Sequence, residues 1–181
     1  MKIIEEPMKD LKLIEPKVFG DHRGYFFESY SKRAFQDLGI NDDFVQDNES
    51  LSATAGVLRG LHFQVPPKAQ AKLIRVIRGK VLDVVVDIRK ESSSYGKHFS
   101  VELSESNKLM LYVPKGFAHG FLTLEADSLF SYKCSEFYYP DHEEAISWND
   151  PQLNINWGVE SVVLSEKDQN AALFSDFQSP F

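Results

Sequence analysis

The amino-acid sequence predicts an all-β fold, a barrel or sandwich made of about ten short strands. Apolar residues recur at every second position in several stretches, as they do along half-buried strands. Glycine and proline separate these stretches at short intervals, which is typical of turns. Helix signals are few, and no repeat or low-complexity tract marks a second unit. We therefore expect one domain over residues 1–181, a length that buries roughly 70% of the unfolded surface.

The strand expected at residues 81–89, VLDVVVDIR, shows the alternation most clearly. Its even-numbered positions are apolar, whereas its odd-numbered positions include Asp83 and Asp87 beside valines. A face that mixes apolar and acidic side chains is unusual in a core but natural in the lining of a polar cavity. The other strands are expected at residues 25–29, 44–50, 56–64, 71–78, 98–103, 108–113, 120–124 and 129–136.

Two short helices are expected outside the sheets. Ser31 is a suitable N-cap for a helix that ends at Leu38, because Gly39 follows as a stop signal. A second helix is expected to begin at Ser165 and to include residues 166–170. The tail at 174–181 is expected to be irregular, and its three phenylalanines predict that it packs against the rest of the chain.

Composition excludes several classes of protein. The net charge of −7 argues against a nucleic-acid-binding surface, which needs clustered lysine and arginine. The single cysteine, Cys134, cannot form an intramolecular disulfide and suits a reducing compartment. No apolar run approaches the ~20 residues of a membrane span, and the start MKIIEEPMKD is too acidic for a signal peptide. We expect a soluble, cytoplasmic protein without a membrane or nucleic-acid partner.

Two stretches place a single histidine among glycines and apolar residues, namely RGLHFQ with His62 and VPKGFAHGF with His119. The second stretch fits the P-x-G-x-x-H signature of cupin barrels, so the expected fold is an all-β, cupin-like jelly-roll barrel or sandwich with a few short helices. The first stretch lacks the partner H-x-H signature, because Gln64 stands where the second histidine would be. A transition metal needs three or four well-placed N, O or S ligands. We therefore expect the barrel without a metal.

Longer motifs resemble one known family over most of the chain, from about residue 3 to residue 174. The following motifs occur in the order and spacing of the dTDP-4-dehydrorhamnose 3,5-epimerases: EPKVFGDHRGYFFESY, FVQDN, VLRGLHFQ, AKLIRVIRGKVLDVVVDIRKES, VPKGFAHGF, YKCSEFYYP and LSEKD. The chain departs from that family at Glu49, at Glu144 and in NAALF after LSEKD, none of which we assign to chemistry. The resemblance implies an isomerase that epimerises C3 and C5 of dTDP-4-dehydro-6-deoxy-D-glucose, with no metal and no organic cofactor.

Such a reaction needs a base for the proton beside the C4 ketone, a cation for the enolate oxygen and an acid on the opposite ring face. The resemblance implies that His62 is the base, Lys72 the cation and Tyr132 the acid. Imidazole suits the first role because it can be neutral and still basic at pH 7. The structural alternatives are a hydrogen-bonded wall histidine, a solvated lysine and a core tyrosine.

A carboxylate is expected to orient His62 and to stabilise its imidazolium form. The resemblance implies that Asp168 in LSEKD has this role. The spacing Ser165-x-x-Asp168 also fits a simple helix cap. Asp83, on the polar face of its strand, is the second candidate.

The resemblance further implies a site for a dTDP-linked ketosugar. Arg23 and Arg59 match the family positions that hold the diphosphate, a group for which the planar guanidinium is well suited. The alternative for both is an ordinary surface ion pair. The other residues implied at the substrate site are Glu28, Gln46, Asp47, Asn48, His119, Glu143 and Lys167.

Other functions stay open at this stage. They are a mono-epimerase or ketoisomerase acting on a related dTDP-4-keto-6-deoxy sugar, a metal-dependent cupin such as a dioxygenase, and a non-catalytic sugar-nucleotide-binding cupin. The presence of both His62 and Tyr132 favours the epimerase. Open sheet edges must be covered, and the family forms dimers, so we expect a homodimer.

Overall fold

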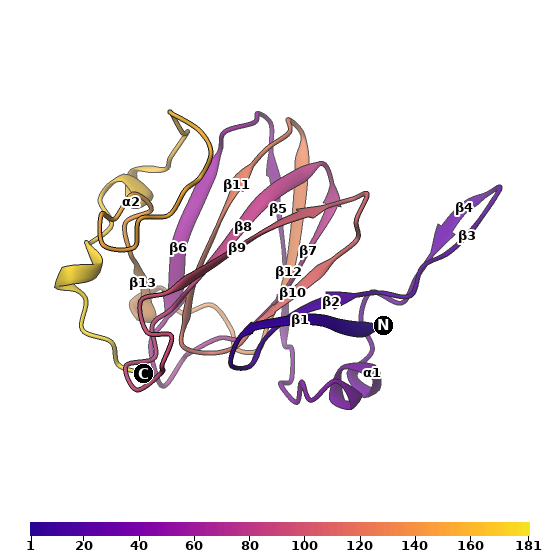
Figure 1. The fold of residues 1–181 in the computed structure, drawn as a ribbon, viewed down its shortest axis with the longest axis horizontal. Helices are drawn as coiled ribbons and strands as arrows, with labels where there is room; N and C mark the ends of the chain where they lie inside the picture. Colours follow the sequence, from indigo (N-terminus) through magenta and orange to yellow (C-terminus); the bar gives the residue numbers. More distant parts are fainter.

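The computed structural model describes all residues, 1–181, and consists of two antiparallel sheets with a short two-stranded arm beside them (Figure 1). The larger sheet has, in spatial order, β1 (Lys2–Met8), β2 (Leu11–Glu15), β10 (Met110–Val113), β7 (Lys72–Arg78), β12 (Ser128–Cys134) and β5 (Gln46–Ser52). The smaller sheet has β13 (Glu143–Ala145), β6 (Leu58–Gln64), β11 (Phe117–Thr123), β8 (Lys80–Asp87) and β9 (His98–Ser104). The arm pairs β3 (Phe19–Asp21) with β4 (Gly24–Phe26). The predicted all-β, cupin-like jelly-roll fold is confirmed.

Helices are few and short, as predicted. In α1 (Lys32–Asp37) the Ser31 hydroxyl accepts a hydrogen bond from the Ala34 amide, and Gly39 follows with φ +77°. The second α-helix is α2 (Glu166–Gln169), and single 3-10 turns form η1 (Pro140–His142) and η2 (Phe174–Asp176). Both predicted helices are therefore confirmed, with Ser31 and Ser165 as their N-caps. None of the helices has the length and apolar character needed to cross a membrane.

Four strands were not expected from the sequence. The edge strand β1 is hard to predict from the sequence because most of its residues are exposed, so it lacks an alternating pattern. The strands β3 and β13 have only three residues each. In β2, however, Leu11 and Leu13 alternate with polar Lys12, a pattern that could have revealed it. Boundaries also differ: residues 27–29 follow β4 outside any strand, and β10 begins at Met110 because Lys108 has φ +54°.

The core lies in three layers. Between the sheets, Ile74 and Phe130 of the larger sheet pack with Val85 and Phe121 of the smaller one. The outer face of the larger sheet is covered by α1 and the loop after it, and the outer face of the smaller sheet by the C-terminal segment. That segment includes the three phenylalanines of the tail, so the prediction that the tail packs is confirmed: Phe174, Phe177 and Phe181.

The mixed face predicted for β8 is also confirmed. Val81 and Val85 point into the core between the sheets, and Asp83 lies on the same face and is fully buried. Val84 and Val86 lie on the opposite face against the C-terminal segment. One buried carboxylate therefore reaches the interior of the sandwich between two valines.

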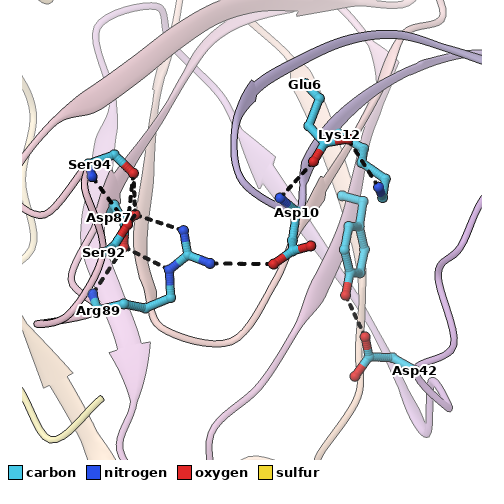
Figure 2. A network of polar contacts seen from close by, with 9 residues as sticks. Glu6, Asp10, Lys12, Asp42, Asp87, Arg89, Ser92 and Ser94 are labelled. Atoms are coloured by element: carbon cyan, nitrogen blue, oxygen red, sulfur yellow. Dashed lines mark hydrogen bonds and ion pairs between the residues drawn. The ribbon is translucent and has the colours of Figure 1, made fainter.

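Asp87, at the end of β8, is 0% exposed and anchors the network in Figure 2. Its carboxylate accepts hydrogen bonds from Arg89 Nε at 2.9 Å and Nη2 at 2.7 Å. The hydroxyls of Ser92 and Ser94 each donate to it at 2.6 Å. Burial raises the pKa of Asp87, but the bonds from Arg89, Ser92 and Ser94 outweigh burial, so the net pKa is lowered. The guanidinium also lies 3.7 Å from Asp10, which links this end of β8 to the turn between β1 and β2.

We predict that Asp87→Asn lowers the free energy of unfolding by about 2–3 kcal/mol at pH 7, because Arg89 loses its buried counter-ion. The folded-state pKa of Asp87 is lowered below an unfolded value of about 3.9. Its stabilisation is therefore present above that value and is lost as pH falls through the folded pKa. Denaturant titrations at pH 7 and pH 3 measure both effects, with exposed Asp37→Asn as control. An equal loss at both pH values would contradict this role for the charge.

Candidate active site

A cavity of about 330 Å³ is lined by strands of both sheets. Three of the four predicted catalytic residues line it, namely His62 from β6, Lys72 from β7 and Tyr132 from β12. The fourth, Asp168, lies behind His62 in α2. Residues far apart in the sequence thus meet at one cavity.

A β-bulge in β6 turns His62 toward this cavity. Leu58 and Leu61 both pack on the outer side of the smaller sheet although three positions separate them, and the pairing of β6 with β11 shifts register between them. Gly60 lies at the shift with φ +121°, and a Cβ there would come within 2.5 Å of the Gly120 Cα. The two glycines let the strands approach closely, as expected for a bulge. After the bulge, His62 faces inward.

His62 and Asp168 form a close pair. The imidazole Nε2 lies 2.5 Å from Asp168 Oδ1, and Asp168 is only 3% exposed. Burial raises the pKa of Asp168, but the hydrogen bonds from His62 and Ser165 outweigh burial and lower it. Asp168 is thus held as a carboxylate, and Nε2 of His62 as the N–H that donates to it. The other ring nitrogen, Nδ1, is left to accept a proton.

Ser165 connects both interpretations of the LSEKD motif. Its hydroxyl accepts from the Asp168 amide at 3.1 Å, which caps α2, and donates to Asp168 Oδ2 at 2.7 Å. The helix cap therefore uses the backbone amide of Asp168, and the orientation of His62 uses its carboxylate. The structure therefore contains both the helix cap and the contact with His62.

Asp83, the second candidate partner for His62, binds a different histidine. Both of its carboxylate oxygens lie near Nε2 of His119, at 2.9 and 3.1 Å. His119 pairs in register with His62 but is only 6% exposed and does not line the cavity. Burial lowers the pKa of His119 and raises that of Asp83, and in each case the partner opposes the shift. This pair lies beneath the cavity.

Lys72 lies on the inward face of β7, which also carries Ile74 of the core. Its Nζ is 3.5 Å from the His62 carbonyl oxygen and 6.0 Å from the centre of the Tyr132 ring. Burial lowers the pKa of Lys72, an effect opposed by nearby acidic groups that include Glu143. An ammonium in such surroundings interacts strongly with a new negative charge, because little water screens it.

Tyr132 reaches the cavity from the larger sheet, whereas His62 reaches it from the smaller one. Burial raises the pKa of Tyr132, as do Cys134 and Glu143, while Asn48 and Arg59 act in the opposite direction. The phenol is therefore neutral at pH 7 and carries a proton that it can donate.

Apart from the buried His119, the predicted substrate-binding residues divide into a group at or beside the cavity and a group away from it. Gln46, Asn48 and Glu143 line the cavity. Lys167 lies beside them and makes a 2.5 Å ion pair with Glu143. Burial raises the pKa of Glu143, but its bonds to Lys167 and to the Tyr138 hydroxyl outweigh burial and lower it.

The second group does not line the cavity. Asp47 lies on the outer face of β5, where Lys133 binds it at 2.8 Å, because neighbours along a strand point to opposite faces. Arg59 is exposed on β6, close enough to lower the pKa of Tyr132. Arg23 and Glu28 are exposed on and just after the arm, which projects away from both sheets in Figure 1. Arg23 pairs there with Asp21.

Several residues at the cavity were not assigned to the site from the sequence, notably Gln64, Gln70 and Tyr138. Gln64 carried a usable signal, because it lies two positions after His62 and so shares its face of the strand. Its amide is fully engaged with backbone groups of neighbouring loops. The chain brings no three His, Cys, Asp or Glu side chains together in an arrangement that could hold a metal ion.

Cys134 lies 1% exposed beneath this cavity, where burial raises the pKa of its thiol although Lys72 opposes the shift. We predict that iodoacetamide alkylates Cys134 of the native protein at least about 100-fold more slowly than free cysteine at pH 8, because both access and thiolate are reduced. Mass spectrometry follows the adduct, and alkylation in denaturant is the control. Rapid labelling of the native protein would contradict the buried placement.

Comparison with known proteins gives the same family as the sequence motifs. A profile of the dTDP-4-dehydrorhamnose 3,5-epimerase family matches residues 5–176. The chain is 48% identical over 177 residues to the dTDP-4-dehydrorhamnose 3,5-epimerase of Shigella flexneri, with 97% of each protein covered.

Solved structures agree. The dTDP-4-dehydrorhamnose 3,5-epimerase of Bacillus anthracis, with TDP and PPi bound, has a TM-score of 0.94 and 50% identity, covering 96% of this chain and 99% of that one. The dTDP-6-deoxy-D-glucose-3,5-epimerase of Legionella pneumophila, in complex with dTDP-4-keto-L-rhamnose, has a TM-score of 0.93 and 47% identity, covering 98% and 94%. The resemblance found in the sequence is confirmed, and the chain belongs to the dTDP-4-dehydrorhamnose 3,5-epimerase family.

Proposed function

We propose that this chain is an isomerase that converts dTDP-4-dehydro-6-deoxy-D-glucose to dTDP-4-dehydro-L-rhamnose by inverting C3 and C5, acting as a single domain over residues 1–181. The observation that carries the proposal is the His62–Asp168 pair at a cavity that Lys72 and Tyr132 also line, in a chain of this family. The proposed chemistry uses side chains alone, with no metal and no organic cofactor.

In the first step, His62 removes the proton from a ring carbon next to the C4 ketone. The C–H electron pair moves into the ring to form an enolate, and the imidazole becomes an imidazolium. The 2.5 Å contact with Asp168 supports this role, because a carboxylate stabilises the charge that the ring gains. The same contact orients the ring so that Nδ1 can face the substrate.

Lys72 is proposed to stabilise the enolate oxygen at C4. One well-placed donor to a developing oxyanion contributes roughly 3–4 kcal/mol to the transition state. The position of Nζ near both His62 and the Tyr132 ring supports this role, because the ketone is bonded to the carbon that must lie between base and acid. Catalysis requires that the interaction strengthen as charge develops, which a fixed ammonium achieves.

Tyr132 is proposed to protonate the opposite face of the same carbon, which inverts it. The support is that His62 and Tyr132 belong to different sheets and line one cavity. Each inversion leaves an imidazolium and a phenolate, so both groups must exchange protons with solvent before the second carbon reacts. Because the pKa of Tyr132 is raised, its phenolate regains a proton readily.

We further propose that the protein is a cytoplasmic homodimer in which each arm reaches the cavity of the partner. Arg23 and Glu28, expected at the substrate site, lie away from the cavity of their own chain. The arm also exposes three large aromatic side chains, of which Phe26 is 70% exposed, and such a surface favours burial in an interface. The arm would bring Arg23 to the diphosphate, which Arg59 approaches from the cavity's own chain.

Product analysis in heavy water tests the reaction. We expect the purified protein to convert dTDP-4-dehydro-6-deoxy-D-glucose to dTDP-4-dehydro-L-rhamnose with deuterium at both C3 and C5, because each inversion takes its new proton from solvent-exchanged groups. Nuclear magnetic resonance of the sugar measures the label. Deuterium at one carbon only would identify a mono-epimerase, and the absence of both exchange and product would indicate a non-catalytic binding protein.

Two variants separate the base from the acid. We expect His62→Ala to slow solvent exchange at both carbons by about 10³-fold, because it removes the imidazole that is paired with Asp168, while dTDP binding is retained. We expect Tyr132→Phe to retain exchange through His62 and to lose net epimerisation. Parallel measurements of deuterium wash-in and product formation distinguish them. Normal turnover by Tyr132→Phe would contradict the acid role.

A further inference from the structure

The segment at residues 136–139, here called the rim segment, runs from the end of β12 to η1 and belongs to no strand. Its Phe137 and Tyr138 side chains are both more than half exposed, and Tyr138 lines the cavity. The Tyr138 hydroxyl donates to Glu143 on the same cavity wall at 2.7 Å. Because the segment pairs with no strand, its peptide groups must find hydrogen-bond partners elsewhere.

Gln64 is the most buried of these partners, at 3% exposure. Its Oε1 accepts a hydrogen bond from the Tyr139 amide at 2.7 Å, and its Nε2 donates to the Phe137 carbonyl at 3.1 Å. The same Nε2 donates to the Lys68 carbonyl at 2.7 Å. One side chain thus joins the rim segment to the loop after β6, with its acceptor and both of its donors in use.

Two more glutamines hold the rim segment, and both line the cavity. Gln70 Nε2 donates to the carbonyls of Glu136 at 2.8 Å and Phe137 at 3.2 Å. Gln46 Oε1 accepts from the Tyr138 amide at 3.0 Å. Side-chain amides therefore hold the rim segment in place, whereas backbone hydrogen bonds hold the neighbouring strands.

This arrangement separates two parts of the site. His62, Lys72 and Tyr132 lie on strands held by backbone pairing. The rim wall, with Tyr138 on it, depends on those amides. We propose that Gln64 is a positioning residue that holds the rim segment against the cavity and so sets affinity for the dTDP-linked sugar rather than the rate of proton transfer. The inference rests on the proposed function.

The identity of residue 64 is consistent with this role. A histidine there, as in an H-x-H metal site, offers at most one acceptor and one donor when neutral, in fixed directions around the ring. A glutamine offers two donors and an acceptor on a longer side chain, which matches the three backbone groups found here. A position suited to a metal ligand in other cupin barrels thus serves to fix a loop.

The test compares Gln64→Leu with the parent protein by steady-state kinetics and by calorimetric titration with dTDP. Leucine keeps most of the volume but removes all three hydrogen bonds. We expect KM for the ketosugar and Kd for dTDP to rise about tenfold or more, with kcat and solvent exchange at saturating substrate changed less than about threefold. Gln70→Ala, at a less buried position, should shift KM in the same direction and serves if Gln64→Leu does not fold.

Thr123→Val is the matched control. Thr123 is buried, and its hydroxyl also ties a loop, donating to the Thr54 carbonyl at 3.0 Å and accepting from the Val57 amide at 3.0 Å, but it does not line the cavity. The Thr123→Val substitution should lower Tm without raising KM for the ketosugar or Kd for dTDP. The inference is overturned if Gln64→Leu and Gln70→Ala lower only Tm, or lower kcat at unchanged KM. An inactive parent protein would instead overturn the proposed function, while dTDP titration would still test the role of Gln64.

Discussion

The structure depends on giving buried carboxylates hydrogen-bond partners within a fold of two largely apolar sheets. A buried carboxylate without a partner is costly, because the interior does not replace its hydration. Asp83 meets His119, Asp87 meets Arg89 and two hydroxyls, and Asp168 meets His62. The pairs of Asp83 and Asp168 join residues far apart in the sequence, whereas Asp87 and Arg89 are close neighbours along the chain. The pairs therefore connect the strands to the loops and to the C-terminal helix.

The same constraint shapes the candidate chemistry. Asp168 would be an isolated buried charge without His62, and His62 without Asp168 would be one more polar group on a barrel wall. Brought together, they form a pair with a fixed orientation, which supports the proposed role of His62 as the base. Lys72 shares the inward face of β7 with apolar neighbours, so it too sits where a developing negative charge is weakly screened. Polar groups inside an apolar sandwich are thus a cost to folding and, in the proposed function, the source of reactivity.

A second constraint is that peptide groups outside helices and strands also need hydrogen-bond partners. The strands satisfy their peptide groups by pairing, but the rim segment has no such partner. Three glutamines that line the cavity provide the bonds. The cavity therefore has strand-built walls that carry the catalytic candidates and a loop-built wall held by side chains.

The sequence by itself determined the all-β class, the two capped helices and the family, because period-two alternation, caps and motifs are local patterns that can be read along the chain. It also singled out His62, Lys72 and Tyr132, which the structure brings to one cavity. Only the tertiary structure decided that Asp168 rather than Asp83 meets His62, since both carboxylates fitted the pattern. Strand alternation turned Asp47 outward, and a bulge at Gly60 turned His62 inward. These outcomes follow from strand register and from contacts between distant segments, and no short stretch of sequence encodes either.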